Sequence, residues 1–158
     1  MANPFDFSTG AVLTAAQLNQ IADFEAKTPS WETGITVGNA TQTLKVAQVN
    51  EICMFELEFE AGSSTSFSTS AMKLDIDNSS MPASASELTY AVIGGGWCRP
   101  DGSTIYALQT VLNAGNILMY AQKHSTGTYT TVTFLKSTVP DSWTTSGNFY
   151  IQGVYRTT

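Results

Sequence analysis

The chain has 158 residues, of which 42% are hydrophobic and only 13% are charged. This length fits one domain with a short appendage, and the hydrophobic content is sufficient for a buried core. With a net charge of −6 and only seven scattered Lys and Arg residues, we expect no nucleic-acid partner. The sequence has no apolar run of about 18 residues and no basic start followed by an apolar stretch, which predicts neither a membrane span nor a secretory signal.

Two parts of the chain differ in pattern, and we expect an N-terminal arm and helix over residues 1–30 and a β-domain over residues 31–158. The arm, residues 1–10, has no period and contains Phe5 and Phe7. It is too short and irregular to bury these aromatics by itself, and leaving them in water is costly. Phe5 and Phe7 are therefore the predicted anchor contacts with a larger partner or a neighbouring subunit.

One short helix is predicted after the arm. Thr14 followed by Gln17 matches a capping box, and the helix should run over Ala15–Ala26 and end before a Thr-Pro pair. Its apolar stripe contains Leu18 and Ile21. A helix of this length is marginal in water, so the stripe should pack either on the β-domain or on copies of itself around a symmetry axis.

The stretch Glu51–Glu60 indicates the fold class, because from Cys53 onward apolar and polar side chains alternate. One dry face and one wet, acidic face are typical of a strand in an antiparallel sheet. We expect further strands at Ile35–Val37, Gln42–Val49, Ser66–Ile76, Leu88–Ile93, Thr104–Thr110, Asn116–Gln122, Thr128–Phe134 and Asn148–Arg156. Turn residues between these strands predict an all-β, antiparallel β-sandwich, with a jelly-roll-like arrangement as the first choice.

The residues that could support metal or histidine chemistry are few. His124 is the only histidine and lies in a predicted surface turn, so a multi-histidine metal site within one chain is excluded and a Ser-His-Asp arrangement is not expected. Asp75, Asp77 and Ser79 have the spacing with which a calcium loop begins, but its glycine and closing glutamate are missing. A turn at a strand end explains these residues with fewer assumptions.

Two further patterns also favour structural interpretations. The glycines over residues 94–96 lack the helix and the Lys-Ser/Thr pair of a phosphate loop, so a bulge or a close backbone contact is the better interpretation. Glu56, Glu58 and Glu60 form an acidic row that we interpret as a solvated face or a surface meeting a basic partner. The sequence therefore predicts no catalytic, cofactor-binding or metal site, and we do not expect the protein to be an enzyme.

Cysteines and tryptophans leave alternatives open. Cys53 and Cys98 could form one disulfide, but nothing indicates an oxidising compartment, which favours two buried thiols. Trp97 and Trp143 lie beside predicted turns, where aromatic rings can stack on sugars. Such rings more often close the ends of a sandwich core or belong to a subunit interface.

Both ends of the chain resemble a known group of proteins. Residues 7–19, Phe-Ser-Thr-Gly-Ala-Val-Leu-Thr-Ala-Ala-Gln-Leu-Asn, resemble the F-x-x-G-x-V-L-T-A-A-x-hydrophobic-N opening of many tailed-bacteriophage structural proteins. These are variously tail fibres, minor tail proteins and head fibres. Residues 28–41 look like the entry to the β-domain of such proteins, and residues 140–156 are similar to their closing strand.

The resemblance implies a virion component, often trimeric, with an anchoring N-terminal part and an outward β-domain. No functional residue carries over, because the shared motif is structural. The chain lacks the repeats and the coiled-coil shaft of long fibres, which favours a capsid-surface decoration, cement-type or head-spike protein. Its expected partners are the major capsid protein or another virion protein, gripped through Phe5 and Phe7, and two further copies, with Leu18 and Ile21 near the trimer axis.

Two other interpretations remain open. The first is a tail-fibre or tail-tip protein that recognises a host-surface glycan through Trp97 and Trp143. The second is a small lectin-like module unrelated to virions.

Overall fold

The structure, a computed structural model, describes residues 23–86, 88–125 and 128–158. All elements in these ranges are strands, and they are antiparallel, which confirms the predicted all-β class. Their bounds are β1 Glu25–Lys27, β2 Trp31–Thr33, β3 Ile35–Thr36, β4 Thr41–Val49, β5 Ile52–Glu60, β6 Ser66–Phe67, β7 Lys73–Asp75, β8 Tyr90–Arg99, β9 Tyr106–Asn113, β10 Asn116–Ser125, β11 Thr128–Phe134 and β12 Asn148–Arg156. In this described part, no helix is long and apolar enough to cross a membrane.

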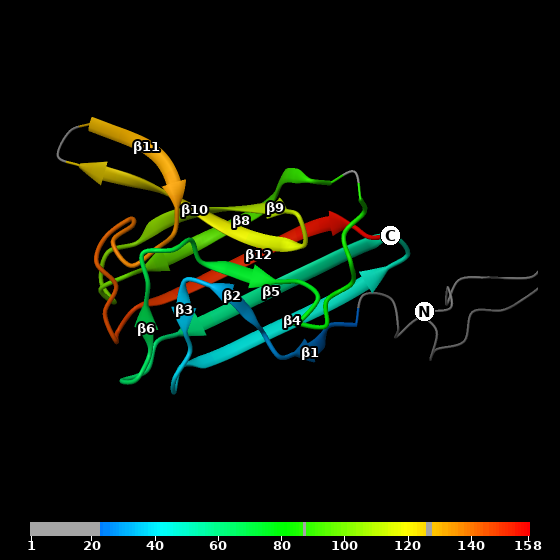
Figure 1. Ribbon diagram of the computed structural model, residues 1–158, viewed down its shortest axis with the longest axis horizontal. Coiled ribbons are helices and arrows are strands. Elements are labelled where there is room, and N and C mark those ends of the chain that lie inside the picture. The colour runs from blue at the N-terminus through cyan, green and yellow to red at the C-terminus, as the bar shows by residue number, and fades with distance from the viewer. Residues whose placement is uncertain (1–22, 87, 126–127) are drawn as a thin grey trace, which may run out of the picture.

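Ten strands form one curled sheet in the order β1-β4-β5-β12-β8-β9-β10-β7-β2, with β11 paired to β10 (Figure 1). β3 and β6 form a separate two-stranded sheet. The curl brings the last strand of the order back onto the middle of the sheet, because Trp31 of β2 packs edge-on against Phe59 of β5 and Phe149 of β12 at 5.9 and 5.8 Å between ring centroids. Both halves of the sheet therefore cover one core, and a jelly-roll-like strand arrangement stays a prediction.

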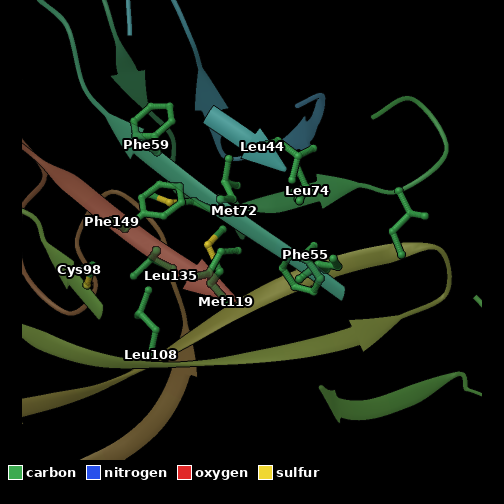
Figure 2. Close-up of a cluster of buried hydrophobic side chains, with 14 of the residues drawn as sticks. Leu44, Phe55, Phe59, Met72, Leu74, Cys98, Leu108, Met119, Leu135 and Phe149 are labelled. Carbon is green, nitrogen blue, oxygen red and sulfur yellow. The ribbon is translucent and has the colours of Figure 1, made fainter. Parts of the chain in front are cut away.

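The core fills the inside of this curl (Figure 2). Phe59 and Phe149 stack at 4.9 Å between centroids, and Met72, Met119 and Leu135 approach them from the other side of the curl. The buried row of β5 contains Cys53, Phe55, Leu57 and Phe59, which is the row that the alternation of Glu51–Glu60 predicts.

The strand β1 corrects the predicted helix. The helix over Ala15–Ala26 was expected to reach the Thr-Pro pair, but Glu25–Lys27 pairs with residues Leu44–Val46 of β4. The edge of β4 offers unpaired backbone groups, and a strand satisfies them where a short helix would leave them open. The rest of the predicted helix, residues 15–22, lies outside the described residues.

The sheet has two distinct ends. At one end, the β4–β5 turn at Asn50 lies beside the last residues of the chain, because the Thr157 amide donates to the Glu51 carbonyl at 2.7 Å. The described chain also begins at this end, since Glu25 pairs with Val46 near the close of β4. The β10–β11 hairpin projects from the opposite end (Figure 1).

Candidate functional site

The sheet face turned away from the core, which we name the outer face, is where a binding site could form. On β5 this face carries Met54, Glu56, Glu58 and Glu60, which alternate with the buried row. The neighbouring central strand β12 contributes Tyr150 and Gln152, because Tyr150 is the register partner of Glu58 and Gln152 that of Glu56. The acidic row therefore lies on one broad surface with polar and aromatic neighbours.

Glu56 is the centre of a polar network on the outer face. Its carboxylate accepts a hydrogen bond from Lys45 Nζ at 3.0 Å, and the hydroxyl of Tyr150 lies 3.4 Å from its other oxygen. Tyr150 also donates to Oε1 of Gln152 at 3.2 Å. Partial burial and the nearby Glu56 charge raise the pKa of Tyr150, while the hydrogen bond to Glu56 raises the pKa of Lys45. Glu56 is thus a paired carboxylate, whereas Glu58 and Glu60 are solvent-exposed.

The two tryptophans that the sequence offered as an alternative sugar-binding pair lie on opposite faces of the sheet. Trp97 is on the outer face as the register partner of Tyr150, and the guanidinium carbon of Arg99 lies 5.3 Å from its ring centroid. Trp143 packs on the core side, with centroids 4.8 Å from Phe67 and 6.0 Å from Phe149. Its indole N–H donates to the Val139 carbonyl at 3.1 Å, so Trp143 closes one end of the core and does not join Trp97 in a common site.

A hollow of about 350 Å³ lies beside the polar network on the outer face. Its lining is mainly apolar and includes glycines of β8 and β12. The lining residues are Phe24, Met54, Phe55, Glu56, Ile93, Gly94, Gly95, Gln152, Gly153 and Val154. Glu56 and Gln152 form the polar side of the hollow, next to Tyr150. Its volume lies in the range of small-ligand pockets.

The glycines in this hollow are required because atoms of the neighbouring strands leave no room for a Cβ. A Cβ added at Gly94 would lie 2.1 Å from the Gln152 carbonyl oxygen, and one at Gly153 would lie 2.6 Å from the Phe55 ring. The ladder also shifts between Val92 and Gly94, which confirms the bulge or close-contact interpretation of residues 94–96. Sequence reasoning located these glycines but missed the hollow, because the partner glycine is far away on β12.

The remaining polar candidates form structural contacts. Both oxygens of Asp75 accept hydrogen bonds from Asn78, at 3.0 and 2.6 Å, and these bonds lower the pKa of Asp75. Ser79 is buried and its hydroxyl accepts from the Ser30 amide at 2.9 Å. This arrangement is the strand-end turn that the sequence favoured over a calcium loop. Within residues 23–86, 88–125 and 128–158, no group of three or more His, Cys, Asp or Glu side chains could hold a metal ion.

His124 and the cysteines occupy strands. His124 was expected in a turn but belongs to β10, where its backbone pairs with Tyr129. The favoured interpretation of two buried free thiols is confirmed for Cys53 and Cys98. Burial raises the pKa of both thiols, that of Cys98 to about 12. Neither thiol is a nucleophile at neutral pH, because the reactive form is the thiolate.

The predicted anchor residues Phe5 and Phe7 and the predicted trimer contacts Leu18 and Ile21 lie outside the described residues. A scan against protein-family models, a search of curated proteins and a search of solved structures each returned no match.

Proposed function

We propose that the protein is a structural component of a tailed-bacteriophage particle, a capsid-surface decoration, cement or head-spike protein that is attached through its N-terminal arm. The arrangement of the two ends of the sheet is the observation that supports this proposal best. The described chain begins at one end, beside the β4–β5 turn, and the β10–β11 hairpin projects from the other (Figure 1). An anchor at residues 1–22 would leave the hairpin end directed away from the attachment point.

In this proposal the β-domain is a jelly-roll-like knob that covers and displays, and the protein works as a homotrimer bound to the major capsid protein or another virion protein. The surface chemistry is consistent with this role. The outer-face carboxylate Glu56 is paired with Lys45, and both thiols are buried, so the described groups form contacts that stabilise the fold.

The arm is tested by deletion. Chains lacking residues 1–10 are added to particles that lack the protein, and occupancy is measured by quantitative mass spectrometry. We expect occupancy to be lost, whereas the outer-face control Trp97→Ala should attach as wild type does. If the deleted chain binds as well as the full chain, the arm is not the anchor, and the outer acidic face becomes the next candidate contact.

Copy number separates the head from the tail. Measured against the major capsid protein, many copies per particle would support the capsid shell. A handful of copies would place the protein in the tail and contradict the decoration role.

A second candidate is a tail-fibre or tail-tip protein that binds a host-surface glycan. The outer face favours it specifically, because Trp97, Tyr150, Gln152 and Glu56 combine aromatic rings with amide and carboxylate acceptors on neighbouring strands. Glycan-array binding of the purified protein tests this candidate. Trp97→Ala should abolish the signal, and Trp143→Phe, on the core side, should retain it.

A further inference from the structure

The apolar side chains of the outer face gather at the end of the sheet where the described chain begins. Val92 is 62% exposed, Val154 50%, Phe24 43% and Ile52 41%. Met54 is the register partner of Val154, and both line the hollow together with Phe24. We name these five side chains, Phe24, Ile52, Met54, Val92 and Val154, the apolar patch. Contiguous exposed apolar surface of this kind marks interaction sites on proteins.

The apolar patch combines a concave part with a convex part. The hollow is concave, and Met54, Ile93, Val154, Gly94 and Gly95 are among the residues that line it. Val92 of β8 and Ile52 of β5 are also exposed apolar side chains, but they do not line the hollow. A surface that carries both a hollow and apolar projections can receive a projection from a second copy while offering its own to a third.

The position of the apolar patch also identifies the occupant. Phe24, the second described residue, lines the hollow itself, so the described chain begins at this surface. Copies held together through the N-terminal part would bring their sheets into contact here, and not at the hairpin end. A small ligand accounts less well for the patch, because Val92 and Ile52 lie outside the hollow.

From these observations we propose that the apolar patch is the interface between copies of this chain, each copy inserting exposed apolar side chains against the hollow of the next. The proposal rests on the homotrimer of the proposed function and gives it a contact surface on the β-domain. Such contacts close into a ring when the rotation between copies permits it.

The test is the mass of the full-length protein by light scattering at micromolar concentration. Wild type is expected at about three times the chain mass of 16.9 kDa. Val154→Arg and, separately, Phe24→Arg should reduce the mass to that of one chain, because each places a charge in the contact. The matched control is Ile105→Arg, since Ile105 is 60% exposed but lies at the opposite end of the sheet, before β9; it should remain at the wild-type mass.

Phe24→Arg serves as a second variant because Phe24 precedes β1 and makes no ladder pair, so its substitution leaves the sheet intact. A wild-type monomer, or trimers that persist in both patch variants, would overturn the proposed interface. These outcomes are independent of the particle assay. A monomer that still occupies particles contradicts the interface and the homotrimer but leaves the anchoring role standing, whereas a patch-dependent trimer that never occupies particles contradicts the anchoring role alone.

Discussion

Cys98 lies on β8 opposite Phe149 of β12 and is fully buried, so its thiol has no access to water. Burial raises its pKa from 9.0 to about 12 in the folded protein. A raised pKa favours the neutral thiol of the folded state. Its contribution to stability is therefore fully present below pH 9 and is lost as the pH rises towards 12.

We expect the free energy of unfolding to fall by about 1–2 kcal/mol between pH 9 and pH 10.5 through this thiol. Urea unfolding of wild type and Cys98→Ala at both pH values measures the effect, because the variant lacks the titrating group. An equal pH dependence in the two proteins would show that Cys98 does not titrate as its burial requires.

The two faces of β5 predict opposite outcomes for neighbouring residues. Phe55 is 2% exposed and packs beside Tyr155, at 6.3 Å between ring centroids, whereas Glu58 is on the outer face. Phe55→Ala should cost about 3–5 kcal/mol through lost contacts and the cavity left behind. Glu58→Ala should change the unfolding free energy by less than about 0.5 kcal/mol. Denaturant unfolding compares them, and equal values would mean that the register is wrong by one residue.

At the scale of elements, the segment between β11 and β12 acts as a cover for the core through Trp143. Replacing Trp143 with Ala should lower the unfolding free energy by about 2–3 kcal/mol, because its ring contacts Phe67 and Phe149 and is only partly exposed. The outer-face variant Trp97→Ala is the comparison and should cost less, since Trp97 does not contact the core cluster. Thermal melting of both variants decides the matter, and a larger loss for Trp97→Ala would contradict the assignment of the faces.

Most long strands could be predicted from the sequence because their period and their turn residues are local signals. β5 and β12 follow the alternation closely, and their predicted bounds agree with the structure to within a residue. The failures occur where the deciding partner is distant. The glycines at residues 94–96 indicated that the predicted strand Leu88–Ile93 ends before them. Instead, β8 continues through these glycines to Arg99, because β12 approaches the backbone there.

Short strands and the outer-face hollow depend on partners that the sequence does not reveal. The predicted strand Ser66–Ile76 is two strands, β6 and β7, which join different sheets. β1 and β2 have only three residues each, too few for a period, and they form because β4 and β7 present open edges. The hollow needs Gly94 and Gly153 side by side from strands far apart in the sequence, which no local pattern indicates.

For the whole molecule, the arm and the sheet should be separable. No described strand includes residues 1–10, and the sheet begins at β1. Deleting residues 1–10 should therefore leave the melting temperature within about 2 °C of wild type, because no strand of the described sheet loses a partner. Calorimetry measures this, and loss of the cooperative transition would show that the arm is part of the fold.

The place of β12 in the sheet has a consequence for synthesis. β12 lies between β5 and β8 and is hydrogen-bonded to both, yet it is made after every other strand described here. Until residue 156 has been translated, the β1-β4-β5 and β8-β9-β10 groups have no strand to join them, and their inner edges remain open. Open edges of this kind invite pairing with other chains. A nascent chain stalled before β12 should thus be prone to aggregation, and the final strand is what turns two incomplete sheets into one.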